Sequence, residues 1–139
     1  MIVVLDTNVI IAALVAEGLC REVVHRAVRA RILASSVPLL DELDATLKRK
    51  FKVTPATAAF LRAFRLQTRL VDPLPLPAPV CRDRDDDVVL ATAVAAGADL
   101  IVTGDKGLLV LASYADVQIL SPRQFLEKLD AGAAPRRAR

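Results

Sequence analysis

The first residues of the chain have the pattern of a buried strand that ends in polar residues. Ile2 to Leu5 is a short, fully apolar run dominated by β-branched side chains. A strand that is apolar on both faces must be covered on both faces, which is typical of parallel sheets in α/β proteins. The polar residues Asp6, Thr7 and Asn8 follow at its carboxyl end. Because such sheets bind ligands beyond the carboxyl ends of their strands, this segment predicts both a fold class and the place of a site.

Strand and helix patterns alternate along the rest of the chain. Further strands are predicted at residues 32–34, 70–71, 100–102 and 117–120. Helices are predicted at residues 9–15, 19–31, 37–50, 55–68, 86–96 and 108–111, with a last one from residue 122. Ser36 and Thr54, each followed closely by a proline, are expected to cap two of these helices. The alternation predicts a mainly parallel sheet with helices on both sides, an α/β sandwich.

The length and composition indicate one domain. The chain has 139 residues, of which 54% are hydrophobic, so it can bury a core. Prolines at every second position from 73 to 79 form an extended connector, but the segment after this connector is too short to fold alone. We expect a single domain over residues 1–130 and a flexible basic tail over residues 131–139. With two cysteines, no long apolar run and no signal-peptide pattern, a cytoplasmic protein without a membrane segment is expected.

Acidic side chains occur in four separate segments that lead to the predicted carboxyl rim of the sheet. They are Asp6 after the first strand, Glu42 early in the third helix, Asp86 and Asp87 at the start of the fifth helix, and Asp105 after the strand that follows it. Crowded carboxylates repel and raise each other's pKa, and a hard divalent cation relieves that conflict. Mg²⁺ and Mn²⁺ take oxygen ligands, so the pattern predicts metal-assisted chemistry on phosphate.

Each acid also has a purely structural interpretation. Asp86 and Asp87 complement the positive end of a helix, and Asp105 lies in a sequence typical of turns. Glu42 and Asp44 flank opposite borders of the apolar stripe of their helix, so periodicity does not choose between them. Asp6 is harder to explain in this way, because an acid at the end of a buried strand is desolvated unless something compensates it.

Several reaction classes are disfavoured by residues that the sequence lacks. His25 is the single histidine, which argues against zinc hydrolysis and a histidine-based triad. The chain has no glycine-rich phosphate loop, and its aromatic content of 4% disfavours a base-stacking platform. Two alternatives to metal-dependent cleavage stay open. One is a phosphatase with Asp6 as nucleophile, although Asn8 stands where such enzymes place a second acid, and the other is a non-catalytic RNA- or protein-binding module.

The motifs together resemble a known family. They are VVLDTNV at residues 3–9, LLDEL at 39–43, RDRDDD at 82–87 and LIVTGDKGLL at 100–109. In order and spacing they resemble the PIN domain, and more narrowly its branch of toxins from toxin–antitoxin systems, related to VapC-type toxins. The resemblance extends from residue 2 to about residue 129. It implies a three-layer α/β/α fold and a ribonuclease that depends on Mg²⁺ or Mn²⁺.

The resemblance also implies site residues. The family's catalytic acids correspond to Asp6, Glu42, the pair Asp86 and Asp87, and Asp105, and the resemblance prefers Glu42 over Asp44. For the metal we predict Asp6, Glu42, Asp87 and Asp105: spacing back from the Thr-Gly-Asp motif favours Asp87, whereas the branch's own acidic motif favours Asp86.

Polar positions that line such sites correspond to Thr7, Asn8 and Thr103. Arg84 stands where this branch often has proline, and no expected acid is missing. The partners implied are an RNA substrate, a protein antitoxin and a second copy of the chain in a homodimer.

Overall fold

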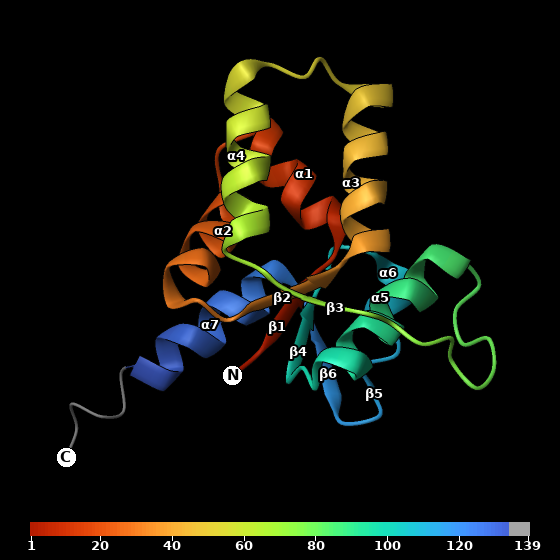
Figure 1. Cartoon of the computed structure of the whole chain (residues 1–139). Coiled ribbons are helices and arrows are strands. Elements are labelled where there is room, and N and C mark those ends of the chain that lie inside the picture. The colour runs from red at the N-terminus through yellow and green to blue at the C-terminus, as the bar shows by residue number, and fades with distance from the viewer. Residues whose placement is uncertain (134–139) are drawn as a thin grey trace.

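The computed structural model describes residues 1–133, in which six strands form one sheet with the order β3-β2-β1-β4-β6-β5 (Figure 1). The strands are β1 (Val3–Leu5), β2 (Leu33–Ser36), β3 (Arg69–Val71), β4 (Leu100–Val102), β5 (Ser113–Tyr114) and β6 (Val117–Leu120). All neighbours are parallel except β5, which pairs antiparallel with β6. The predicted mainly parallel sheet is confirmed; β5, with only two residues, was too short to show in the sequence pattern.

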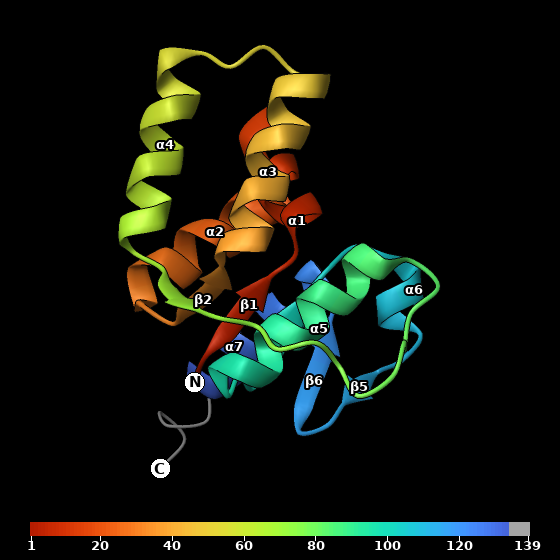
Figure 2. The ribbon, with the colours of Figure 1, turned by 45° about the vertical axis from the view of Figure 1, so that its right-hand side comes forward.

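Helices cover both faces of this sheet (Figures 1 and 2). They are α1 (Thr7–Val15), α2 (Leu19–Ala30), α3 (Val37–Lys50), α4 (Pro55–Leu66), α5 (Arg84–Ala96), α6 (Lys106–Leu109) and α7 (Pro122–Ala133). Helices α1, α2 and α7 pack on one face, and α5 and α6 pack on the other. Helices α3 and α4 project away from the sheet as an antiparallel pair (Figure 2). This is the expected three-layer α/β/α arrangement.

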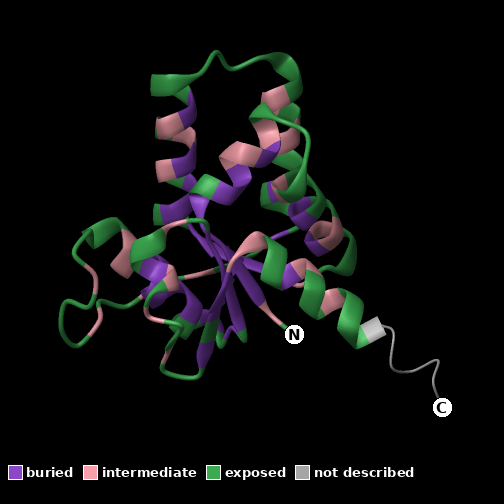
Figure 3. Cartoon of the chain, turned by 180° about the vertical axis from the view of Figure 1, so that it is seen from behind, coloured by how far each residue is buried: buried purple, intermediate pink, exposed green. Residues whose placement is uncertain are grey.

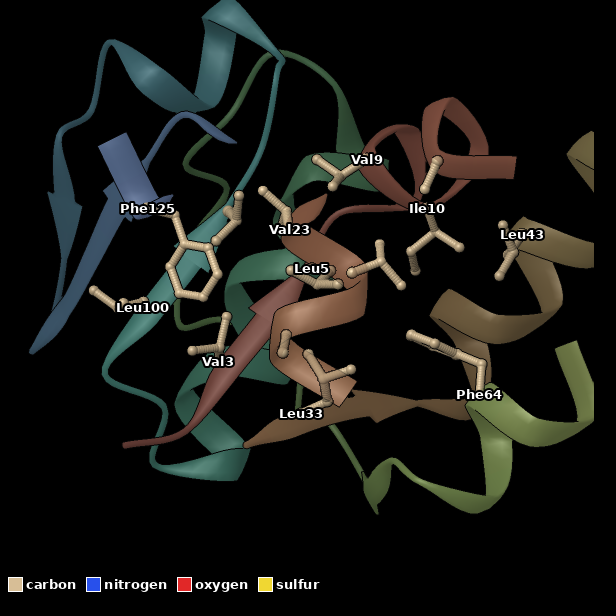
Figure 4. Close-up of a cluster of buried hydrophobic side chains, with 14 of the residues drawn as sticks. Val3, Leu5, Val9, Ile10, Val23, Leu33, Leu43, Phe64, Leu100 and Phe125 are labelled. Carbon is tan, nitrogen blue, oxygen red and sulfur yellow. The ribbon is translucent and has the colours of Figure 1, made fainter. Parts of the chain in front are cut away.

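The central strand β1 contributes side chains to two separate cores. Val3 and Leu5 pack with side chains of α1, α2 and α7, among them Phe125 (Figure 4). Val4 points to the opposite face and packs with Leu90 of α5 and other apolar residues. Both faces of the strand are therefore buried, which explains its uninterrupted apolar sequence. The burial of the central strands is visible in Figure 3.

Helix caps explain where the sequence placed helix boundaries correctly and where it did not. The Ser36 hydroxyl accepts the amide of Leu39 at 3.4 Å, and the Thr54 hydroxyl accepts that of Thr57 at 3.1 Å, as predicted. Helix α5 begins two residues earlier than predicted, because the Asp83 carboxylate accepts the amide of Asp85 at 2.9 Å and caps it there.

The C-terminal boundary differs slightly from the expectation. Helix α7 continues through Ala133, so the first residues of the predicted flexible tail are helical. The rest of that predicted tail, residues 134–139, lies outside the described residues. Among the helices of residues 1–133, none is both long enough and apolar enough to cross a membrane.

Candidate active site

An acidic cavity of about 1110 Å³ opens where β1 and β4 end. These two strands are neighbours, with Leu5 of β1 opposite Val102 of β4. Within the sheet, β2 is the neighbour of β1 on one edge and β4 is its neighbour on the other, so the strand order reverses at this point. Sheets of α/β proteins form their ligand crevices at such switch points. The acidic residues of the lining are Asp6, Glu42, Asp83, Asp85, Asp86 and Asp105.

Asp6 is held beneath this cavity and is only 6% exposed. Its backbone amide donates to the carbonyl of Val102 at 2.9 Å, which joins the end of β1 to the end of β4. Its Oδ2 accepts a hydrogen bond from the Thr103 hydroxyl at 2.7 Å. Burial raises the pKa of Asp6, hydrogen bonds from Thr103 and Thr7 act in the opposite direction, and the charge of Asp105 raises it further.

Thr103 links two of the acids from below. It is fully buried, and its hydroxyl, which donates to Asp6, also accepts the backbone amide of Asp105 at 3.0 Å. Asn8 makes a parallel link, because its Oδ1 accepts the amide of Gly104 at 3.4 Å. The turns after β1 and β4 are therefore joined through side chains. Thr103 and Asn8 lie at the site, as does the cavity-lining Thr7, where the sequence placed all three.

Asp86 of α5 and Asp105 before α6 face the same space. A methyl group added at Gly107 would lie 3.4 Å from Oδ2 of Asp105 and 3.6 Å from Oδ2 of Asp86. The pKa of Asp86 is raised to about 7, first by burial, then by a hydrogen bond with Asp105 and by nearby negative charges. Near neutral pH and without a cation, Asp86 is therefore partly protonated and can donate to Asp105.

The structure shows which of Glu42 and Asp44 lies at the site, a choice that the helical pattern left open. Glu42 lines the acidic cavity, and its pKa is raised by burial and then by other cavity acids, Asp85 first. Asp44 lies on the other side of α3, where its Oδ2 is 3.5 Å from the guanidinium of Arg65 in α4. Asp44 therefore forms an ion pair between α3 and α4, and Glu42 is the acid of this helix that lies at the site.

Asp87 does not line the acidic cavity, although it was predicted as a metal ligand. Its carboxylate accepts the backbone amides of Cys81 at 2.7 Å and Val80 at 3.2 Å. Burial acts to raise the pKa of Asp87, but these hydrogen bonds and the charge of Arg84 lower it overall. The connector before α5 crosses the side of the helix that carries Asp87. The structure thus brings Asp86, the alternative, to the other acids, and turns Asp87 away from them.

The cavity also has lining residues that the sequence did not predict. Cys81, interpreted as a packing residue, lines it together with the exposed cations Arg82, Arg84 and Lys106. Burial first, and then Asp87, raise the pKa of the Cys81 thiol to about 12, so it stays protonated at neutral pH. The available signal in the sequence was that these residues are close neighbours of the predicted acids. For Cys81 and Arg82, the direction of the side chain depends on the path of the connector.

The donor set fits a hard divalent cation. With the thiol protonated, the strong donors of the cavity are carboxylate oxygens, which Mg²⁺ and Mn²⁺ prefer. The raised pKa values of Asp6, Glu42 and Asp86 reflect burial and mutual repulsion that a cation would relieve. Within residues 1–133, however, no three His, Cys, Asp or Glu side chains stand close enough to form a ready-made metal centre.

Comparison with known proteins agrees with this geometry. A family model described as the PIN domain matches residues 2–107, which is more than half of the chain and includes Asp6, Glu42, Asp86 and Asp105. No curated protein matches the chain closely. PIN domains are generally nucleases, and they generally use divalent metals. The fold, the cavity and the sequence match lead to the same assignment: the chain belongs to the PIN domain family.

Proposed function

We propose that this protein is a divalent-metal-dependent ribonuclease that hydrolyses RNA phosphodiester bonds. One observation carries the proposal: Asp6, Glu42, Asp86 and Asp105 come from four separate segments and line a single cavity at the switch point of the sheet. Membership of the PIN domain family supports a nuclease in general. RNA as the substrate and Mg²⁺ or Mn²⁺ as the ion are the finer parts of the proposal.

The residues have distinct roles in this scheme. Asp6, Asp86 and Asp105 would hold one or two ions. When bound, an ion supplies positive charge that neutralises the phosphodiester and acidifies water. Thr103 fixes the orientation of the Asp6 carboxylate through its hydrogen bond to Oδ2. Glu42, with its raised pKa, is suited to orient a water molecule and accept its proton, or to serve as a further ligand.

The test is cleavage of a single-stranded RNA of mixed sequence in Mg²⁺ or Mn²⁺. Asp6→Asn and Asp105→Asn should abolish cleavage, because each removes a carboxylate from the cavity. Asp116→Asn is the matched control, since it removes the same charge from the exposed turn between β5 and β6. Cleavage that persists in excess chelator, or in the Asp6→Asn protein, would contradict the proposal.

Two other outcomes would replace it. A phosphoaspartate trapped at Asp6 would indicate a phosphatase with that residue as nucleophile. Asn8, two residues on, is an amide whose oxygen lies 3.4 Å from the Gly104 amide, so it offers no second acid for such a reaction. An Asp6→Asn protein that keeps the full biological effect of the natural one would indicate a non-catalytic RNA- or protein-binding module.

We further propose that the ribonuclease is the toxin of a toxin–antitoxin pair. It would act on cytoplasmic RNA, form a homodimer and be restrained by a protein antitoxin. The motif pattern of the sequence supports this role. So does an apolar cleft of about 550 Å³ between α2 and α4, lined in part by Val24, Val28, Phe60 and Phe64, which offers a surface for a protein partner.

Growth after induced expression tests this role. The natural protein should arrest growth, and Asp6→Asn should relieve the arrest. Equal arrest by both proteins would contradict toxicity through RNA cleavage, and normal growth with the natural protein would remove the toxin role while leaving the cleavage assay to judge the nuclease. Light scattering on the purified chain tests the dimer against the monomer mass of 15.0 kDa.

A further inference from the structure

The connector that leads into α5 is held by one carboxylate. Prolines at 73, 75, 77 and 79 cannot donate hydrogen bonds, so Val80 and Cys81 carry the first two consecutive amides after them. Asp87 accepts both amides, at 3.2 and 2.7 Å. In the part of the chain that the structure describes, the hydrogen bonds of residues 74–82 all go to Asp87, which the Cys81 thiol also contacts. Leu76 and Cys81 also pack against the core on the α5 side of the sheet, so Asp87 supplies the polar anchor of the segment at its end next to α5.

Arg82 lies between two fixed points. The amide of Cys81 on one side is bound by Asp87, and on the other side Asp83 is fixed as the cap of α5 by its bond to the Asp85 amide. Arg84 follows as the first residue of α5. Asp87 thus fixes the backbone from which the Arg82 guanidinium extends to the mouth of the acidic cavity, whereas Arg84 is already held by the backbone of α5.

Three cations surround the acidic cavity without forming ion pairs. Arg82, Arg84 and Lys106 line the acidic cavity and are exposed. Within residues 1–133, none of the three lies within 4.0 Å of a carboxylate oxygen. Arg84 acts on Asp87 only at longer range. Exposed cations beside a carboxylate cavity are placed to bind phosphates that flank the one held at the acids.

We propose that Asp87 is a positioning residue: by holding the amides of Val80 and Cys81, it fixes Arg82 where it binds a phosphate of the RNA strand. This inference rests on the proposed function. In this scheme two adjacent residues have different roles: Asp86 would hold the ion, and Asp87 would support the binding of the substrate. Lys106 belongs to α6, outside the held segment, and so binds independently of Asp87.

The direction in which Asp87→Asn changes the affinity for RNA distinguishes a positioning role from a simple effect of charge. We would measure fluorescence anisotropy of a short fluorescein-labelled single-stranded RNA in chelator, where no cleavage occurs. Removing a negative charge should tighten the binding of a polyanion. The positioning role predicts the opposite for Asp87→Asn, severalfold weaker binding, whereas the control Asp116→Asn should bind as tightly as the natural protein or slightly more tightly.

Salt dependence and double variants identify the cations involved. Arg82→Gln should lower the slope of log affinity against log salt by about 0.7 if it removes one phosphate contact to a single strand. Combining Arg82→Gln with Asp87→Asn should add little further loss, because both disturb the same contact. Combining Lys106→Gln with Asp87→Asn should give additive losses. Additivity in the Arg82 pair, or unchanged or tighter binding by Asp87→Asn alone, would overturn the proposal.

A metal titration distinguishes positioning from ligation. The Mg²⁺ concentration for half-maximal cleavage should stay unchanged in Asp87→Asn, whose KM for RNA rises, and should increase in Asp86→Asn. An equal increase in both variants would make Asp87 a ligand and refute the inference. Amide exchange at Val80 and Cys81, faster in Asp87→Asn with the core amides unaffected, verifies that only the segment is released. RNA binding with the predicted pattern but no cleavage would support this inference while refuting the nuclease.

Discussion

The protein should become more stable when one of its catalytic acids is neutralised. The perturbation is Asp86→Asn, measured on the metal-free protein in chelator. Folding raises the pKa of Asp86 from an ordinary 3.8 to about 7, through burial and then through its contact with Asp105. The folded state therefore resists ionisation of this carboxyl, which the unfolded chain does not. An isosteric amide removes that conflict, although it can no longer hold a cation.

The size of the effect follows from the difference between the two pKa values. A difference of about three pH units corresponds to an upper bound of about 4 kcal/mol. Asp86 is only half-buried, so solvent screening reduces this, and we expect about 1–2 kcal/mol. The sign is fixed by linkage: below about pH 4 both states are protonated, and the penalty grows as the pH rises toward 7. As the pH rises through this window, the free energy of unfolding of the natural protein should decrease because Asp86 ionises. Asp86→Asn has no carboxyl to ionise and should not show this decrease.

Thermal unfolding by circular dichroism as a function of pH is the assay. At a pH of about 8, Asp86→Asn should unfold about 4–8 °C higher than the natural protein, and the difference should disappear near pH 4. Mg²⁺ should stabilise the natural protein more than the variant, because it binds the folded state through the carboxylate. A variant that is equally stable or less stable at a pH of about 8, with Asp116→Asn unchanged, would refute the electrostatic reasoning.

Three substitutions test the scaffold beneath the site. Thr103→Val removes the hydroxyl that joins Asp6 to the next turn and should cost about 1–3 kcal/mol and most of the cleavage rate, whereas Thr103→Ser should retain both. Ser36→Ala removes a helix cap and a 2.8 Å bond to Thr92, and urea unfolding should show a loss of about 1–2 kcal/mol; a change near zero would contradict the cap. Phe125→Ala empties a fully buried core position and should cost about 3–5 kcal/mol without changing the Mg²⁺ concentration for half-maximal cleavage.

The architecture could be predicted because its signals are local. The apolar run before Asp6 required two covered faces, and the structure places Val3 and Val4 in opposite cores. Ser36 and Thr54 predicted two helix starts, because capping depends on residues that are neighbours in the chain. The starts of α1, α5 and α6 were each predicted two residues late. Helices α5 and α6 are capped by Asp83, which is one of several acids in its segment, and by Asp105, which the sequence suggested as a turn residue.

Parts of the site could not be predicted, because they depend on contacts between distant elements. Glu42 and Asp44 are equivalent in the pattern of α3 alone. The ion pair of Asp44 with Arg65 exists only because α4 packs beside α3. Cys81 likewise reaches the cavity only because the connector crosses α5 on the side of Asp87. In both cases a neighbouring element decides which polar group remains for the site.

The choice between Asp86 and Asp87 is a question of how α5 is rotated. Adjacent residues of a helix point about 100° apart, and the rotation of α5 turns Asp85 and Asp86 toward the cavity and leaves Asp87 outside its lining. The sequence of α5 gives no rotation, since it is apolar from residue 88 to 91 and residues 89–93 are all buried. One hydrogen bond joins this stretch to the sheet: the Thr92 hydroxyl donates to the carbonyl of Val88 in its own helix and pairs with the hydroxyl of Ser36 at the end of β2. The rotation of α5 is therefore fixed by its contacts with the sheet, this hydroxyl pair and the packing of Val89, Leu90 and Ala93, and motif spacing within the chain carries no information about those contacts.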